Sequence, residues 1–238
     1  MDHFAAANVL RLLSISGHLL RLPATTRATA VVLFHRVNDY LKTTDMSNVP
    51  QDALREQALV MALLNLASKQ TESHRKLRDI VNCTYWAYNH NASQDKGHLQ
   101  IGKEYWTWRD ILVTTELVVL RILNFDLQVH LPFQWLPEII DDICAQDKWD
   151  FSGGVGGRNA ILLAQVSWDY VCLAVSVERI VTKHSALSLA LACVFVAMKA
   201  AKFRLPWTVE KWCGPYQKQG SCTVDQLRDA IKDMSRFA

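Results

Sequence analysis

The most distinctive polar residue of the sequence is Glu116, which stands in the middle of the apolar run 114-TTELVVLRILNFDL-127. At about 100° per residue in an α-helix, this acid falls within roughly 40° of a direction shared by four leucines, namely Leu112, Leu120, Leu123 and Leu127. Burying an unpaired carboxylate costs on the order of several kcal/mol. We therefore expect that this face is a solvated edge or that a group outside the helix pairs with Glu116.

The other residues that could do chemistry lack the spacing that catalysis or metal binding requires. The eight histidines form no H-E-x-x-H pair, and the six cysteines form no C-x-x-C pair. The glycine-rich stretch 153-GGVGGRNA-160 follows no predicted strand and precedes no Lys-Ser or Lys-Thr, so it is typical of a linker rather than a phosphate-binding loop. No nucleophile motif of the G-x-S-x-G kind is present. We therefore expect no catalytic residue, no metal and no cofactor.

The composition favours a folded intracellular protein. Half of the 238 residues are hydrophobic, which is enough to bury a substantial core. The formal net charge is +3 and the basic residues are scattered, so we expect no nucleic-acid or membrane partner. The first residues show neither the basic segment nor the cleavage site of a signal peptide. The longest apolar run, residues 185–198, is too short to span a bilayer.

Hydrophobic periodicity predicts helices along almost the whole chain and almost no strands. Prolines and a polar stretch separate these helices into two series of five. The first series is predicted at residues 3–20, 24–42, 51–69, 75–84 and 104–127. The second series is predicted at residues 132–146, 158–176, 184–202, a short segment after Pro206, and 223–236.

The two series resemble each other at a fixed offset of 130 residues, at which the stretch ALVMALLNLASK aligns with SLALACVFVAMK (199 − 69 = 130). Small residues coincide at this offset: Ala62 with Ala192, and Ala67 with Ala197. The matches favour an internal duplication in which the third helix of each half is a closely packed axis. We therefore expect two domains, residues 1–130 and 131–238.

Two tandem five-helix bundles with a central third helix are the architecture of the cyclin fold, and the sequence itself resembles cyclins. The stretch LASKQTESHRKLRDIVN is similar to the cyclin segment around the L-A-x-K-x-x-E motif. The stretch ELVVLRILNFDL is similar to the E-x-x-x-L-x-x-L-x-F-x-L signature of the fifth helix in the first cyclin box. The resemblance covers essentially the whole chain and is strongest between about residues 55 and 136. Within the family, the run WRDILVTTELVVLRILNFDLQVHLPFQWL most resembles cyclin Q.

This resemblance implies a role for Glu116. In cyclins, a third-helix lysine and a fifth-helix glutamate hydrogen-bond the backbone around the regulatory helix of a bound kinase, and Lys69 and Glu116 match these two positions. Charge-assisted hydrogen bonds in a partly dry interface are strong, which agrees with such a role. The resemblance also implies kinase contacts at the acid that closes the K-x-x-E motif and at three apolar positions, namely Glu72, Leu120, Phe125 and Leu127.

The sequence departs from the commoner cyclin pattern in two places. Where K-[VF]-E-E is usual, the chain has Lys69-Gln70-Thr71-Glu72, which replaces one acid and one apolar contact with neutral polar residues. The M-R-A-I-L-x-x-W substrate-docking motif is absent, because the first helix reads ANVLRLLSISGHLL. We therefore do not expect substrates to be recruited by that patch.

The function implied by the resemblance is that of a non-catalytic regulatory subunit, which binds a cyclin-dependent protein kinase through its first cyclin box and activates it. The same resemblance implies residence in the nucleus. The alternative is a transcription-factor-B-like adaptor, which uses two cyclin folds to bridge promoter DNA and protein. Such adaptors need a basic stripe and usually carry a zinc ribbon with paired C-x-x-C knuckles, and the sequence shows neither. A helical scaffold without a kinase partner is a further alternative.

Overall fold

The computed structural model describes residues 6–43, 54–90, 99–145, 155–201, 208–217 and 222–237. In these ranges all regular elements are helices and no strand occurs, which confirms the all-α class expected from the sequence. The internal contacts divide the chain into two units, Met1–Val129 and His130–Ala238.

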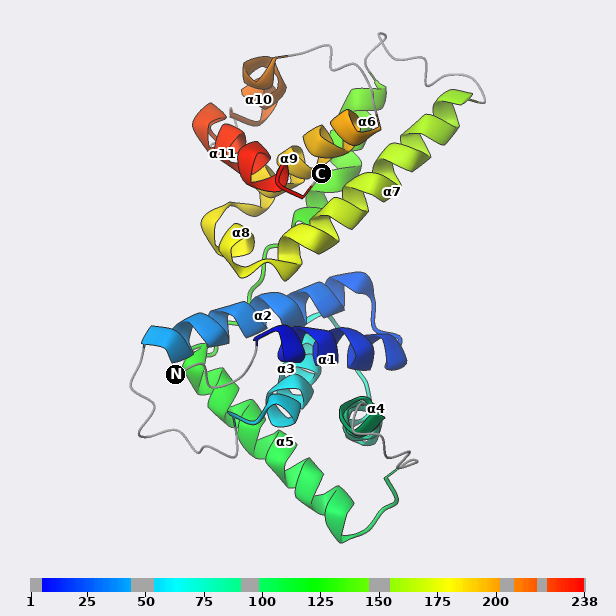
Figure 1. Ribbon diagram of the computed structural model, residues 1–238, viewed down its shortest axis with the longest axis vertical. Helices are drawn as coiled ribbons and strands as arrows, with labels where there is room; N and C mark the ends of the chain where they lie inside the picture. The colour runs from blue at the N-terminus through cyan, green and yellow to red at the C-terminus, as the bar shows by residue number, and fades with distance from the viewer. Residues whose placement is uncertain are drawn as a thin grey trace. The chain divides into compact units, whose positions relative to one another are not determined.

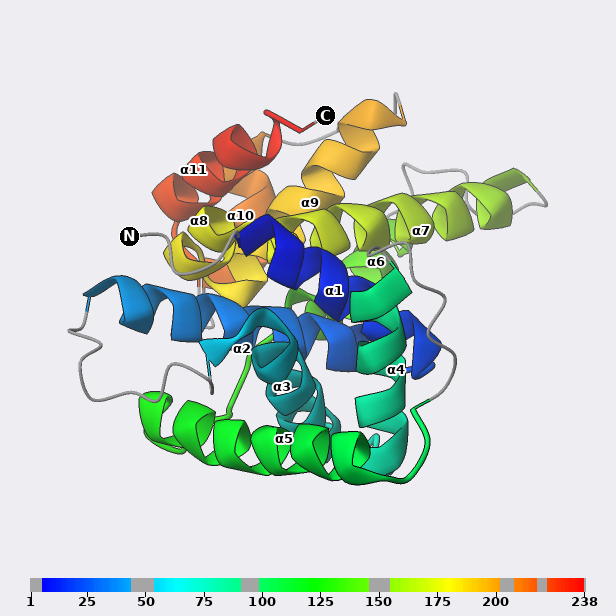
Figure 2. The ribbon, with the colours of Figure 1, turned by 60° about the horizontal axis from the view of Figure 1, so that its bottom comes forward.

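The first unit is a helical bundle with α3 at its centre (Figures 1 and 2). Its helices are α1 (Ala6–Leu19), α2 (Ala24–Thr43), α3 (Glu56–Gln70), α4 (Leu77–His90) and α5 (Lys103–Ile122). Every residue of α3 from Ala58 to Ser68 is buried, because the four other helices all contact it. Figure 2 shows α3 lying between α5 and the α1–α2 pair, with α4 at one side. Alanines along α3 leave room for this close approach from several directions.

Three helices of the first unit end with a residue in the left-handed backbone conformation. These residues are Arg21 (φ 50°) after α1, Glu72 (φ 54°) after α3 and Asn124 (φ 50°) after α5. Each end is closed by the hydrogen bonds of a Schellman motif; after α5, for example, the Phe125 N–H donates to the Leu120 carbonyl at 2.8 Å. None of these ends carries a glycine, and the one asparagine, Asn124, stands inside an apolar run that predicts a longer helix. The helix predicted to reach residue 127 therefore ends earlier, at Ile122.

The second unit has α9 as its central helix. Its elements are a 3₁₀ turn, η3 (Pro132–Trp135), followed by α6 (Leu136–Cys144), α7 (Val155–Ser176), α8 (Glu178–Lys183), α9 (Ala186–Ala200), α10 (Val209–Gln217) and α11 (Val224–Met234). Helices α6, α7 and α11 and the turn η3 all contact α9, and Ala192 and Ala197 are completely buried, which confirms the packed axis. The short helix α8 was not predicted, because six residues carry too little periodicity to be recognised.

Residues Asn159–Ser176 of α7 have the length and apolar composition of a membrane-crossing segment, the one such case among the described helices. One side of this helix, which includes Leu163, Ser167 and Val171, is buried in the second unit, where α7 packs against α9. Core helices of globular bundles have the same composition. Length and composition alone therefore assign no membrane role to α7.

Larger side chains in the buried part of α9 test the sequence alignment of this helix with α3. Replacing Ala192 or Ala197 with Leu inserts three carbons into a fully buried position of α9 and should lower the free energy of unfolding by about 1 to 3 kcal/mol. The matched control is Ala200→Leu, at the exposed end of the same helix, which should change stability little. Thermal and chemical melts of the three variants measure the difference, and equal stabilities would contradict the packing.

A buried acid ties α11 to the segment between α8 and α9. Asp233 is almost fully buried and accepts hydrogen bonds from Lys183 Nζ at 2.9 Å and from His184 Nε2 at 3.0 Å. These hydrogen bonds, from Lys183 first and His184 second, lower the pKa of Asp233 to about 2. A carboxyl group whose pKa is depressed in the folded protein stabilises it above the unfolded pKa, and this contribution is lost as the pH falls.

We expect Asp233→Asn to destabilise the second unit by about 2 kcal/mol near neutral pH, because a pKa lowered by about two units corresponds to roughly that free energy. In the parent protein the contribution should be complete above the ordinary carboxyl pKa of about 4 and should disappear as the pH falls towards about 2. The control is Asp229→Asn, since Asp229 is exposed and lies 3.9 Å from the same Lys183. Melts across this pH range would refute the assignment if Asp233→Asn and Asp229→Asn behaved alike.

Candidate functional site

Glu116 is paired where α5 crosses the end of α3. Its Oε2 accepts a hydrogen bond of 2.7 Å from Asn65 Nδ2, and its Oε1 accepts one from Lys69 Nζ. Asn65 and Lys69 are four residues apart on α3, so they lie on the same helical face and meet the acid together. The structure therefore places the two polar residues implied by the cyclin resemblance in direct contact.

The three members of this group differ in exposure. Asn65 is buried, the Glu116 side chain is 13% exposed and the Lys69 side chain is 51% exposed. The carboxylate thus lies at the rim of the bundle rather than in its core. Two of its roughly four acceptor positions and one of the three ammonium donors are used within the protein. The remaining positions are available for hydrogen bonds with groups outside this chain.

Sequence reasoning did not identify Asn65 as part of this group. An amide inside the apolar run LVMALLNLAS resembles a helix-packing residue with a satisfied side chain, and its partner is 51 positions away. The available signal was the spacing of four residues between Asn65 and Lys69. It places the amide one helical turn before the lysine that the cyclin resemblance implies in kinase binding. A buried amide that donates a hydrogen bond to a carboxylate fixes the orientation of that carboxylate, so Asn65 holds Glu116 in place.

Glu72 occupies the left-handed position that closes α3. Its side chain is exposed, and the turn around it is held by the Ser73 N–H, which donates to the Ser68 carbonyl at 2.9 Å. The neighbouring Thr71 hydroxyl is hydrogen-bonded to the Thr26 hydroxyl of α2 at 2.7 Å. The end of α3 is thereby fixed to a second helix, and Glu72 stands in solvent three residues after Lys69.

The turn after α5 carries two more of the predicted contact residues. Phe125 has a left-handed backbone (φ 60°) and a 67% exposed side chain, whereas Leu127 is half-buried against the core. This turn is tied to α2, because Arg36 Nη2 donates to the Gln128 carbonyl at 2.9 Å and Arg36 Nη1 lies 3.8 Å from Asp126 Oδ2. Leu120, one turn after Glu116 on α5, is also half-buried against the core.

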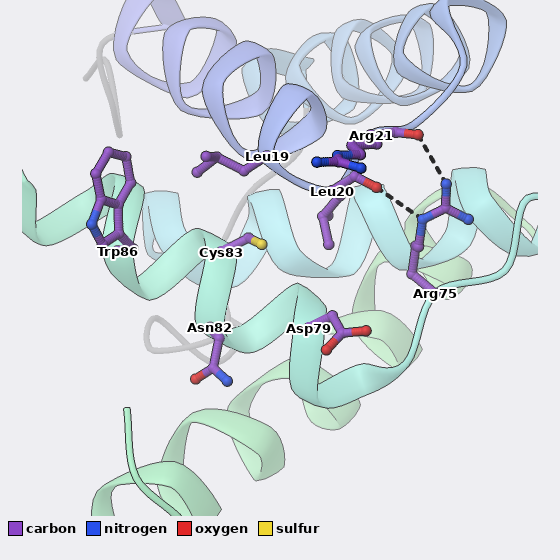
Figure 3. Close-up of a pocket in the computed structure, with 8 residues that line it drawn as sticks. All are labelled: Leu19, Leu20, Arg21, Arg75, Asp79, Asn82, Cys83 and Trp86. Carbon is purple, nitrogen blue, oxygen red and sulfur yellow. Dashed lines mark hydrogen bonds between the residues drawn. The ribbon is translucent and has the colours of Figure 1, made fainter. Parts of the chain in front are cut away.

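The first unit also contains a cavity of about 470 Å³ where the end of α1 meets α4 (Figure 3). Its lining is Leu19, Leu20, Arg21, Arg75, Asp79, Asn82, Cys83 and Trp86. As Figure 3 shows, Arg75 donates to the carbonyls of Leu20 and Arg21, both at 2.9 Å, so this guanidinium is used to close the end of α1. None of the predicted contact residues lines the cavity. Burial, followed by the charge of Asp79, raises the pKa of the Cys83 thiol and makes it a poor nucleophile.

Within the described part of the chain, no group of three or more His, Cys, Asp or Glu side chains could hold a metal ion. The buried cysteines Cys213 and Cys222 approach each other with Sγ atoms 3.9 Å apart, but no histidine or acid completes a ligand set. Burial first, and then the neighbouring Cys222, raises the pKa of Cys213 to about 11. The polar group around Glu116 is therefore the strongest candidate site of the described residues.

Comparison with known proteins finds cyclins among the relatives in sequence. No family model matches the chain. Cyclin pch1 of Schizosaccharomyces pombe is 38% identical over 134 residues, which are 56% of this chain and 36% of that protein. Cyclin-L1 of Xenopus laevis is 27% identical over 82% of this chain and 35% of its own length, and Cyclin-T1-3 of rice (Oryza sativa subsp. japonica) is 27% identical over 92% and 39%. The chain thus spans little more than a third of the length of these curated relatives.

Solved structures show the same fold. A yeast RNA Pol II CTD kinase complex, CTDK-1, contains a chain that matches 98% of this one with a TM-score of 0.70 at 17% identity, over 64% of that chain. The CAK complex of Chaetomium thermophilum bound to ATP-γ-S matches 96% of this chain with a TM-score of 0.65 at 14% identity, over 60% of its own chain. The relatives in sequence are cyclins, which supports the resemblance of this chain to the cyclin superfamily. The relatives named above are other cyclins, so the assignment to cyclin Q stays a prediction.

The residues with a left-handed backbone in the first unit predict an unusual response to substitution by glycine. Glu72→Gly and Asn124→Gly should each stabilise the fold, by about 0.5 to 1 kcal/mol, because a side chain at positive φ is strained and glycine is not. The control is Gln70→Gly, two residues earlier in the last turn of α3, where glycine should destabilise by a similar amount. Equilibrium melts measure the sign, and destabilisation by all three substitutions would show that the two turns are not strained.

Proposed function

We propose that this chain is the regulatory, non-catalytic subunit of a cyclin-dependent protein kinase and that residues 1–130 and 131–238 are its two cyclin boxes. The first box is the one that contacts the kinase, through Lys69, Glu72, Glu116, Leu120, Phe125 and Leu127. The observation that carries the proposal is the position of the Asn65–Glu116–Lys69 group at the rim of the bundle.

The exposure of Lys69 supports a partner for this group. A partly exposed ion pair typically contributes only about 0 to 1 kcal/mol to stability, so the stability of the fold alone gives little reason for this pair. Here a nearly covered carboxylate is held by a buried amide, while the ammonium that pairs with it is half-exposed. A polar pair of this kind offers an acceptor and donors to the backbone of a partner, and its hydrogen bonds strengthen when that partner excludes water.

Backbone strain at two of the proposed contact residues is a second support. Glu72 and Phe125 both have positive φ values, and both hold an exposed side chain outside the bundle. Strain of this kind costs on the order of 1 kcal/mol or more and is found preferentially at functional sites. A large aromatic ring that is mostly in water is also typical of a contact surface whose partner is absent.

In the proposed mechanism the chain does no chemistry itself. It packs against the mobile regulatory helix of the kinase and holds that helix in the inward position, where the Lys–Glu ion pair of the kinase forms. Because the subunit binds this active conformation more tightly than the inactive one, binding shifts the population of the kinase towards activity.

A kinase that acts in transcription is the partner class to test first. One solved relative in fold is a complex of an RNA polymerase II CTD kinase, and several relatives in sequence are cyclins L and T. Nuclear residence belongs to the same proposal. A transcription-factor-B-like adaptor would instead bind DNA with strong salt dependence, which a binding assay at two salt concentrations distinguishes.

We expect Glu116→Ala and Lys69→Ala each to weaken kinase binding about ten- to a hundredfold, which corresponds to the loss of hydrogen bonds to charged groups. The double variant should lose less than the product of the two factors, because both residues belong to one hydrogen-bonded group. Leu120→Asp should bind more weakly still, since it introduces an unpaired charge into an apolar contact. Titration with the kinase that co-purifies with the chain measures these affinities.

Melting temperatures of the free variants separate a binding role from a structural one. The control is Asp229→Ala, which removes an exposed acid from α11 in the second unit and should leave affinity unchanged. Glu116→Ala could instead unfold the free chain while its folded fraction binds the kinase normally. That result would show that the carboxylate only stabilises the fold, and the assignment of Glu116 to the kinase contact would be wrong.

A further inference from the structure

Two buried cysteines of the second unit lie with their thiol groups in contact. Cys213 belongs to α10, and Cys222 immediately precedes Thr223, the residue that caps α11. Their Sγ atoms are 3.9 Å apart, and the Cys213 thiol can donate to the Cys222 sulfur or to the Cys222 carbonyl oxygen, which is 3.6 Å away. The contact joins two elements of the fold, and none of the proposed kinase contact residues takes part in it.

The Cys222 sulfur is held beside Cys213 by a further hydrogen bond. Ser188 of α9 donates to this sulfur at 3.2 Å, and Ser185 in turn donates to the Ser188 hydroxyl at 2.9 Å. Burial, followed by the neighbouring Cys222, raises the pKa of Cys213 to about 11, so Cys213 stays protonated near neutral pH. Of the two sulfurs, that of Cys222 is therefore the one that attacks an oxidant first.

The helix α10 can supply the movement that a bond between these sulfurs needs. The two atoms must approach by roughly 2 Å, because a disulfide bond is about 2.0 Å long. Among the described helices α10 packs chiefly on α11 (Figure 1), and Pro215 inside it lacks the N–H of a helical hydrogen bond. A side-chain carbon at the neighbouring Gly214 would meet no atom of the described chain within 4 Å, so the packing leaves room beside this turn.

We propose that Cys213 and Cys222 are a reversible disulfide site, which links α10 to the start of α11 when the chain meets a peroxide. The Cys222 sulfur attacks one peroxide oxygen and the O–O bond breaks. A sulfenic acid forms on Cys222, and the displaced hydroxide takes up the thiol proton and leaves as water. The Cys213 sulfur then attacks the sulfenic sulfur, so that the S–S bond forms, the S–O bond breaks, and the hydroxyl leaves with the Cys213 proton as a second water. Two electrons pass from the two thiols to the peroxide, which is reduced to water.

Thiol–disulfide exchange reverses the reaction. Two molecules of a thiol such as glutathione reduce the bond and are themselves joined by a disulfide. In a reducing compartment the bond is therefore transient, which is the usual form of a redox-sensing disulfide. While it lasts, the bond closes the short connection between α10 and α11 and restricts the unfolded chain, so the oxidised second unit should melt at a higher temperature. The inference does not depend on kinase binding.

The test exposes the reduced full chain to hydrogen peroxide, blocks the remaining thiols by alkylation and digests the chain with trypsin. Lys218 separates the two cysteines into peptides 212–218 and 219–228, so a bond between them appears as a linked peptide pair. We expect this pair in the monomeric chain, its removal by dithiothreitol, and a higher melting temperature of the oxidised chain. In Cys222→Ser, Cys213 should be oxidised about tenfold more slowly, because its thiol is rarely ionised. The matched control is Cys172→Ser, which removes an exposed thiol of α7 and should leave the linked pair unchanged.

The measurement on the parent chain decides the inference without the variants. If peroxide oxidises the exposed Cys172 while Cys213 and Cys222 stay reduced, the pair is not a redox site and the inference is wrong. The same conclusion follows if the linked pair appears only in covalent dimers or only in denaturant. Equal oxidation rates of Cys213 in the parent and in Cys222→Ser would show that the two cysteines react independently, which also overturns the inference.

Discussion

The Glu116 carboxylate lies against the buried helix α3 and has to be paired there. This pairing determines how α5 packs on α3. The amide of Asn65 and the ammonium of Lys69 approach the carboxylate from one face of α3, which fixes both the rotation and the register of α5 on α3. A shift of one residue along either helix would rotate one member of the group away by about 100°. The pairing thus favours one packing of α5 on α3, since the other buried side chains of these two helices are mainly apolar and impose little directional preference.

The ends of the helices determine where the remaining contact residues stand. Schellman turns after α3 and α5 stop both helices abruptly and direct the chain outward, so that Glu72 and Phe125 are presented beside the ends of the helices that carry Lys69 and Glu116. The turn after α5 is further held by Arg36 of α2. The predicted contact residues are therefore displayed by a rigid set of turns, which lowers the entropy cost of binding a partner.

The polar group and the apolar residues have different roles in the proposed interface. In that interface Glu116 accepts hydrogen bonds from backbone N–H groups and Lys69 donates to backbone carbonyls, and both give orientation because they require defined distances and angles. Leu120 and Phe125 offer apolar area, which gives affinity with little directional preference. Neutral residues Gln70 and Thr71, which stand where many cyclins have an apolar residue and an acid, reduce the charge near Lys69.

The sequence by itself determined the helical class and the buried central helices that are α3 and α9 in the structure, because these follow from periodicity and from small residues that recur at a fixed spacing. It also singled out Glu116, since an acid in an apolar stripe demands a partner, while Lys69 was implied by the resemblance to cyclins. Only the tertiary structure revealed the hydrogen bond of Asn65 to Glu116, the early end of α5, the helix α8 and the exposed apolar side chains of α5. The physical reason is that local periodicity reports which face of a helix is apolar. The partner of a polar group 51 residues away, a cap without glycine and the exposure of an apolar side chain all depend on which helices pack together.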